Sequence, residues 1–329
     1  MGCECLQKND EADLYTSKIT PEDLKTNIIS IPEEDQIESK SMPLELSLLI
    51  KSKFNKVNKT PIKFISITSE EFIDIQNRNT YAKEIINQYT PQLNQINYEN
   101  DVKYQNIPPI RVIDPEGGSQ YYQGGYNSKG ECHGKGIWIR DYDIYIGNFR
   151  NDQFFGQGLF ITERGDYYFG LWKNSMCEGN GNLVVKNKLI NNGNFKNGKR
   201  EGYGEEKYNE GDEYKGAFFN DEKCGKGQYI FADGSRYDGN FRNNKFNGFG
   251  QICLNNGDFI RGEFKNGKLN GEGDVNWKDG TKFVGNFVKG KKYGVGTYIS
   301  NDGQIYKGTW EDDDLYESNA INDINMMTI

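Results

Sequence analysis

Residues 237–250 read YDGNFRNNKFNGFG, and this stretch contains both halves of a pattern that organises most of the chain. The first half places an aromatic residue, a glycine and a second aromatic residue at alternate positions, Tyr237, Gly239 and Phe241. The second half is the glycine pair Gly248 and Gly250. Alternate side chains of a β-strand share one face of a sheet. The spacing therefore predicts two strands rather than a helix.

The first half recurs every 23 residues from one end of the pattern to the other. Its glycines are Gly124, Gly147, Gly170, Gly193, Gly216, Gly239, Gly262, Gly285 and Gly308. The position two residues after each glycine is always aromatic, and the position two residues before it is aromatic except at Asn191 and Ile260. A glycine pair follows eight of the nine copies. Residues 119–310 thus contain eight repeats and a ninth partial repeat.

Each repeat is predicted to be a β-hairpin. Pairs such as Asp233-Gly234 and Asp302-Gly303 separate one repeat from the next, and Asp-Gly is a strong turn signal because tight turns need positive φ. Glycine on the aromatic face leaves room for rings to lie on the backbone. One hairpin could not shield its rings from water alone, so neighbours must stack. We predict an all-β repeat array, an elongated antiparallel ribbon of hairpins.

The 23-residue unit resembles the MORN (membrane occupation and recognition nexus) repeat, because the spaced motifs Tyr-x-Gly-x-Phe and Gly-x-Gly recur in phase. The chain departs from that pattern at Asn191, at Ile260, at Lys188 where a turn glycine is expected, and in a longer first repeat. The resemblance implies a non-enzymatic scaffold or adaptor that docks a partner protein. The alternatives are a module that binds phosphoinositides directly, and a structural component of a cilium or another microtubule assembly.

The segments outside the array differ in composition. Residues 1–40 are rich in acidic residues and predict an acylation signal followed by a disordered tether. Residues 41–118 predict a mixed helical region, in which a capping box at Thr68 and Glu71 begins a helix that runs to about Tyr89. We expect this helix either to cap the first edge of the array or to dock a partner. Residues 311–329 form an acidic tail.

The chain begins MGCECLQKND, which predicts lipidation. Removal of Met1 would expose Gly2 for myristoylation, and Cys3 and Cys5 stand beside it for thioester acylation, although Leu6 occupies the position usually held by serine or threonine. Two or more acyl chains anchor a protein stably, whereas one does not. The protein would then lie at the cytoplasmic face of a membrane or on a cortical or ciliary cytoskeleton. The other interpretation is an unmodified start with incidental cysteines.

Composition argues against several other classes of function. The formal net charge is −8, and the 27 basic and 23 acidic residues of the array are interspersed, unlike the clustered basic face of a nucleic-acid-binding protein. The six cysteines lack the paired spacing of a zinc site. The single histidine, His133, occupies a repeat position that accepts many residue types, which indicates a surface position rather than a catalytic base. We expect no enzyme activity, no metal and no cofactor.

Partner selection should depend on positions at which the repeats differ, because the packing rings are nearly the same in every copy. Phe154, Phe155, Phe246 and Tyr293 lie in such connections and are candidate interface anchors, or else they fold back and cover the edge of the sheet. Lys289, Lys291 and Lys292 are candidate contacts for an anionic lipid.

Overall fold

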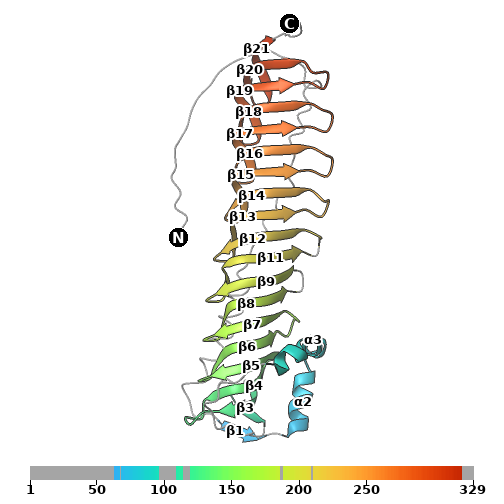
Figure 1. The fold of residues 1–329 in the computed structure, drawn as a ribbon. Coiled ribbons are helices and arrows are strands. Elements are labelled where there is room, and N and C mark those ends of the chain that lie inside the picture. The colour runs from blue at the N-terminus through green and yellow to red at the C-terminus, as the bar shows by residue number, and fades with distance from the viewer. Residues whose placement is uncertain are drawn as a thin grey trace. The chain divides into compact units, whose positions relative to one another are not determined.

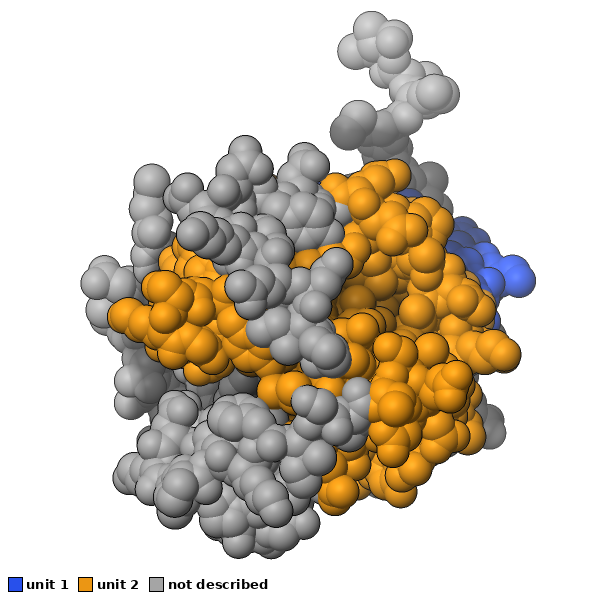
Figure 2. Space-filling view, turned by 90° about the horizontal axis from the view of Figure 1, so that it is seen from below, with its two compact units in different colours: residues 1–34, 246–329 blue, residues 35–245 orange. Residues whose placement is uncertain are grey.

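The computed structural model describes residues 63–66, 68–95, 109–113, 119–185, 188–208 and 210–320. Contacts divide the chain into unit 1, residues 1–34 and 246–329, and unit 2, residues 35–245, which Figure 2 shows in different colours. In the described part of both units, antiparallel strands that pair with their sequence neighbours predominate (Figure 1).

Unit 2 contains two helices and most of the strands. Its elements are β1 (Lys63–Ser66), α2 (Ser69–Asn77), α3 (Ala82–Asn94), β2 (Ile110–Ile113), β3 (Ser119–Tyr126), β4 (Cys132–Arg140), β5 (Asp143–Arg150), β6 (Gln153–Ile161), β7 (Tyr167–Lys173), β8 (Met176–Val185), β9 (Lys188–Lys196), β10 (Lys199–Arg200), β11 (Gly202–Tyr208), β12 (Glu213–Phe219), β13 (Glu222–Ile230) and β14 (Arg236–Arg242). Each strand from β1 to β8 pairs with the next, β9 pairs with both β10 and β11, and β11 to β14 continue the order.

Unit 1 continues the same pattern with strands alone among its described residues. Its elements are β15 (Lys245–Cys253), β16 (Phe259–Lys265), β17 (Lys268–Asn276), β18 (Lys282–Val288), β19 (Lys291–Ile299), β20 (Ile305–Glu311) and β21 (Asp314–Ala320). Each pairs antiparallel with the next. The all-β hairpin array is confirmed. The structure adds β21 after Trp310, so the ninth copy is also a hairpin and part of the predicted acidic tail is a strand.

The ring of Tyr214 explains why glycine recurs on the aromatic face. Its hydroxyl donates a 2.9 Å hydrogen bond to the carbonyl of Ala217, which holds the ring flat over the backbone. Gly216 pairs with Gly227 on the next strand, and both glycines lie beneath the Tyr214 ring. A Cβ atom at Gly227 would lie 2.7 Å from Cε2 of Tyr214, closer than real Cβ contacts come. The predicted room for a ring from a neighbouring strand is confirmed, and the same ring also covers Gly216 of its own strand.

The first glycine of each pair has a different role. Gly225 has a φ of 59° and stands where the pairing of β12 with β13 shifts register between Gly216 and Ala217. A β-bulge of this kind needs positive φ, which glycine adopts without strain. The Gly-x-Gly motif therefore combines a bulge with a ring-covered position.

The tightest turns are not the Asp-Gly pairs. They lie within the repeats after the first, as in Asn220 and Asp221 between β12 and β13, where φ is 51° and 72°. Positive φ at both positions is the requirement of a two-residue type I′ turn. The Asp233-Gly234 connection is also a turn, but it is wider, and Phe231 N–H donates to Ser235 O across it at 2.9 Å.

The predicted helix is present as two helices. Its start is confirmed, because Glu71 N–H donates to Thr68 Oγ1 at 3.1 Å and Thr68 N–H donates to Glu71 Oε2 at 2.7 Å. The chain breaks at Asn79, whose buried amide donates to Tyr142 O at 2.8 Å and Thr162 O at 3.2 Å. Asn79 fastens the α2–α3 connection to two turns of the sheet.

Both helices cover a face of the sheet and not the first edge of the repeat array (Figure 1). That edge, at β3, pairs with β2, and β2 pairs in turn with β1. The helices pack on the face opposite the aromatic rings, here called the outer face. The buried residues of this contact are Phe72, Ala82, Tyr89, Leu93, Ile139, Ile144, Ile146, Leu159, Ile161 and Phe169. The aromatic face of the same strands forms a separate core that includes Tyr122, Trp138, Tyr145, Phe149, Phe154, Phe160, Tyr168 and Trp172.

Candidate functional site: a groove position that carries three cations

One position of the repeat, here called the groove slot, projects its side chain over the aromatic face. It is the second residue of the second strand of each hairpin and is buried in every copy from the second onward: Phe154, Cys177, Arg200, Lys223, Phe246, Leu269, Lys292 and Leu315. The two-residue turn places it there by pairing it with the aromatic residue of the first strand, as Phe218 pairs with Lys223. Most copies are apolar, and three are cations.

Backbone hydrogen bonds fix the groove slot to the following turn. Lys223 N–H donates to Asn244 Oδ1 at 2.8 Å, and Asn244 N–H returns a bond to Lys223 O at 3.2 Å. Lys292 and Asp313 exchange the same pair of bonds at 2.8 and 3.2 Å. The turn residue thereby aims each groove-slot side chain inward.

Two of the four predicted interface anchors are groove-slot residues, and for these the prediction is wrong. Phe154 is completely buried and stacks on Tyr145, with ring centroids 3.6 Å apart. Phe246 is also buried. Phe155 is half-buried beneath the guanidinium of Arg150, whose Cζ lies 3.8 Å from the ring centroid. Tyr293 is exposed.

The predicted lysine triad does not form one surface. Lys292 is 1% exposed and points inward, so it cannot contact a lipid head group from this position, and this part of the prediction is wrong. Lys289 is an exposed turn residue. Lys291 is exposed, with its Nζ 3.4 Å from Asp312 Oδ1.

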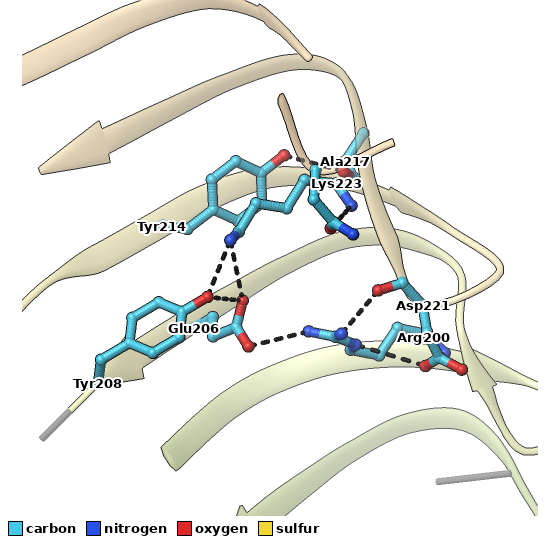
Figure 3. A network of polar contacts seen from close by, with 8 residues as sticks. Arg200, Glu206, Tyr208, Tyr214, Ala217, Asp221 and Lys223 are labelled. Atoms are coloured by element: carbon cyan, nitrogen blue, oxygen red, sulfur yellow. Dashed lines mark hydrogen bonds and ion pairs between the residues drawn. The ribbon is translucent and has the colours of Figure 1, made fainter. Parts of the chain in front are cut away.

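In unit 2, Arg200 and Lys223 share the carboxylate of Glu206 (Figure 3). Arg200 Nη1 lies 3.2 Å from Glu206 Oε1, and Lys223 Nζ lies 3.6 Å from Glu206 Oε2. The hydroxyl of Tyr208 donates to Glu206 Oε2 at 2.5 Å and accepts from Lys223 Nζ at 2.8 Å. Burial, followed by the nearby Glu206 charge, raises the pKa of Tyr208. The hydroxyl is therefore a neutral donor at physiological pH.

Asp221 completes the network from the turn. Its Oδ1 lies 3.4 Å from Arg200 Nε, and its carbonyl accepts from Arg200 Nη2 at 2.6 Å. Burial raises the pKa of Asp221, while its bonds to Arg200 act in the opposite direction. Two cations and two carboxylates thus balance within the aromatic groove. Glu206, the polar residue at an otherwise apolar repeat position, is explained by these partners.

Lys292 of unit 1 has a different environment. Its Nζ lies 5.4, 5.6, 5.8 and 5.2 Å from the ring centroids of Trp277, Phe283, Tyr298 and Trp310. Burial lowers the pKa of Lys292, while the nearby charges of Asp313 and Asp314 act in the opposite direction. Among the side chains that the structure describes, no carboxylate forms an ion pair with it.

The remaining predicted sites carry less information. Gly2, Cys3 and Cys5 lie outside the described residues. His133 is half-buried on β4. The described residues contain no group of three or more side chains suited to a metal ion. Within the same residues, no helix is long and apolar enough to cross a membrane.

The fold and the groove define a β-hairpin repeat protein, and comparison with known families identifies the repeat. The family model for the MORN repeat matches residues 145–167, 168–184, 192–213, 214–236, 237–259, 261–282 and 283–305. Seven MORN repeats are therefore present in this part of the chain. They indicate a repeat-based binding or scaffold module of a non-catalytic kind.

Other comparisons are less informative. No curated protein matches the chain. Among solved structures, the TCP domain of SAS-4 from Drosophila melanogaster, in complex with a proline-rich motif of Ana2, is 14% identical over 47% of this chain and 85% of that chain, with a TM-score of 0.30. A point mutant of the TCP10 domain of Danio rerio CPAP is 12% identical over 64% and 99%, with a TM-score of 0.33. These TM-scores are too low to establish a common fold.

Proposed function

We propose that the protein is a scaffold that docks a partner protein on the outer face of its MORN-repeat array. Acylation at Gly2, Cys3 and Cys5 would hold the scaffold at a membrane or a membrane-linked cytoskeleton. The aromatic face is less suited to docking than the outer face, since its rings are buried and its groove slots are filled by the chain's own side chains. The repeats also differ on the outer face, where the differing side chains are exposed.

The observation that carries this proposal is the middle residue of the Gly-x-Gly motif. This residue faces outward and changes from copy to copy: Lys135, Gln157, Asn180, Tyr203, Lys226, Phe249, Glu272 and Val295. Tyr203, Phe249 and Val295 are 62%, 53% and 73% exposed. Large apolar side chains held outward on a rigid sheet are suited to act as interface anchors. Sequence reasoning missed them, although strand alternation already placed this residue opposite the rings.

Unit 2 shows how another segment can dock on the outer face of such strands. Its outer face already receives an amphipathic helix pair from the same chain, with Phe72 and Tyr89 buried against the strands. In unit 1, Val284 is 54% exposed and lies diagonal to Val295 across the β18–β19 pair, which extends the apolar surface there. An apolar or aromatic face of a partner protein is therefore the expected ligand.

The phosphoinositide alternative receives less support from the same geometry. Of its three lysines, Lys292 is buried and Lys291 pairs with Asp312. Direct lipid binding would weaken steeply with salt, because surface electrostatic attraction is screened. Docking through apolar side chains would persist in high salt.

Capture of partners from native extract tests the proposal. Phe249→Ser with Val295→Ser should lower recovery of a specific partner at least tenfold. The matched control, Lys226→Ser with Glu272→Ser, changes the same repeat position in the copies that precede Phe249 and Val295 and should leave recovery unchanged. Both variants should melt within a few degrees of the wild type. Equal recovery with all three proteins would contradict the proposal.

Fractionation tests the anchor separately. Gly2→Ala, or Cys3→Ser with Cys5→Ser, should move the protein from the membrane or cytoskeletal pellet into the supernatant. The cysteine variant keeps one acyl chain, which binds only marginally, and the Gly2 variant loses all chains if myristoylation licenses the later acylation of the cysteines. Variants that still pellet would show that the array itself holds the protein there.

A further inference from the structure

The outer face of unit 1 carries an apolar surface on β18 to β20, here called the end patch, which consists of Val284, Val295, Ile299 and Ile305. Ile299 and Ile305 are cross-strand partners, and Val284 lies diagonal to both Val295 and Ile299 across the β18–β19 pair. Val284, Val295 and Ile305 are exposed. Cross-strand and diagonal neighbours of a sheet face contact one another, so the four side chains form one continuous surface.

The end patch repeats positions that the chain itself covers in unit 2. Three of its members stand 138 residues, which is six repeats of 23, after residues of the contact with α2 and α3: Val284 after Ile146, Ile299 after Ile161 and Ile305 after Tyr167. Two of these positions hold Lys207 and Glu213 in another copy, where they form an ion pair at 2.8 Å. The sheet itself therefore does not require apolar residues there, and their return in unit 1 indicates a second covered surface.

Residues 321–329, here called the end segment, have the composition and the position to cover this patch. They read INDINMMTI, with five large apolar side chains and one charged side chain, Asp323. The last described strand brings the chain to the patch, because Ala320 pairs with Tyr306, the neighbour of Ile305. Val284 lies three strands from β21, about 15 Å at the usual strand spacing, and nine extended residues reach about 30 Å. Every residue of the patch is within reach.

Charge favours the same occupant. Lys282 and Lys307 are exposed at the margin of the patch, where Lys282 pairs with Ile299 and Lys307 pairs with Thr297 across the strands. Asp323 carries the opposite charge. Burial of apolar surface is favourable, and a segment joined to the same sheet binds at a high effective concentration. The end segment thus competes well against a separate molecule.

We propose that the end segment docks on the end patch of its own chain and closes this part of the outer face until a partner protein displaces it. The inference rests on the proposed function, because Val295 belongs to both contacts. It adds a regulatory step to that function. In the free protein Phe249 stays open to a partner while Val295 is covered.

Peroxide oxidation of the full wild-type chain tests the docking. Met326 and Met327 should be oxidised at least threefold more slowly in the folded protein than in the urea-unfolded chain, as measured by mass spectrometry of the peptide that contains them. The ratio should not change on dilution, because the contact lies within one chain. Equal rates in the folded and unfolded chains overturn the inference. Protection that disappears on dilution overturns it in favour of a second copy of the chain.

A pair of variants tests which surface the end segment covers. Ile324→Asp with Met327→Asp should release the segment, so that hydroxyl-radical oxidation of Val295 and Ile305 rises at least threefold relative to that of Phe249. The matched control, Asn322→Asp with Asn325→Asp, adds the same charge to the same segment and should leave this ratio unchanged. No rise in the first variant, or an equal rise in the control, overturns the inference. Circular dichroism identifies a variant that does not fold, and the wild-type peroxide measurement decides without it.

Capture from native extract tests the regulatory step. Ile324→Asp with Met327→Asp should raise partner recovery at least threefold over wild type, and the control variant should not. Equal recovery overturns the competition between partner and end segment. If Met326 and Met327 are protected while Phe249→Ser with Val295→Ser captures as much partner as wild type, the docking stands and the scaffold proposal falls. If they are unprotected while capture depends on Phe249 and Val295, only this inference falls.

Discussion

The ring of Phe154 stacks on the ring of Tyr145, with centroids 3.6 Å apart and planes 5° from parallel. Tyr145 in turn meets Phe149 and Trp172 edge to face, at 5.1 and 5.6 Å. The two edge-to-face contacts have a favoured aromatic geometry, whereas Phe154 and Tyr145 lie face to face. The groove slot thus closes the aromatic face with the protein's own side chain, which leaves partner recognition to other surfaces.

Gly147→Ala should destabilise unit 2 by about 1–3 kcal/mol, the usual cost of overpacking a core. The added Cβ would lie 2.6 Å from Tyr145 Oη and 2.6 Å from Gly158 Cα. Thermal or denaturant unfolding measures the effect. In a Tyr145→Leu background the same substitution should cost less, because one of the two overlaps is removed. Equal costs in both backgrounds would show that the ring does not restrict Gly147.

Glu206→Ile alone should destabilise the protein by about 3–5 kcal/mol, because it leaves two buried cations with less counter-charge. Glu206→Ile with Lys223→Leu should cost less than the single substitution, since Ile252 and Leu269 form this combination two repeats later. Denaturant unfolding of the single and double variants measures the difference. A double variant less stable than the single one would mean that Lys223 stabilises the groove even without Glu206.

Asn79→Ala should loosen α2 and α3 from the sheet at a cost of about 2–3 kcal/mol, because two backbone carbonyls lose a buried donor. Hydrogen exchange should show faster exchange in α3 with little change in β12 to β14. Asn77→Ala, an exposed position at the end of α2, is the control and should change neither. Unaltered exchange in α3 would show that the apolar contacts alone hold the helices.

Stability should rise with pH on the alkaline side because of Lys292. Its folded pKa is lowered by burial below the ordinary 10.5, so the unfolded chain binds the proton more tightly. The penalty is complete below the folded pKa and disappears as pH rises toward 10.5, with a slope of at most about 1.4 kcal/mol per pH unit.

The difference in unfolding free energy between wild type and Lys292→Met, measured from pH 7 to 9.5, isolates this contribution. Wild type should gain stability relative to the variant as pH rises. Buried tyrosines such as Tyr145, whose pKa is raised by burial, contribute the opposite slope only near and above pH 10. A constant difference over this range would mean that the rings stabilise the ammonium as well as water does.

The sequence predicted the aromatic face and the hairpins because strand alternation and a fixed period determine them locally. The sequence analysis did not predict that the groove slot faces the rings. Phe246 and Lys292 follow two-residue turns, and the spacing of the motifs alone indicated open loops there. A type I′ turn reverses the chain so that these residues rejoin the ring face. The two-residue turn could have been predicted from the asparagine that begins the connection between the two strands of a repeat, as in Asn220-Asp221.

Long-range contacts explain the other differences. The helix break at Asn79 depends on carbonyls 63 and 83 residues away, which no local pattern reveals. The position of the helices on the outer face could have been predicted from the sequence. Ile144, Ile146 and Leu159 occupy outward slots that hold charged residues such as Glu213, Lys215 and Glu205 in later repeats.

Hydroxyl-radical footprinting of the captured complex tests most directly whether the outer face is the docking surface. Oxidation of Phe249 and Tyr203 in the free protein should fall at least several-fold when the partner is bound, while the buried Phe246 stays weakly oxidised in both states. Unchanged oxidation of Phe249 and Tyr203 in a saturated complex would contradict the account.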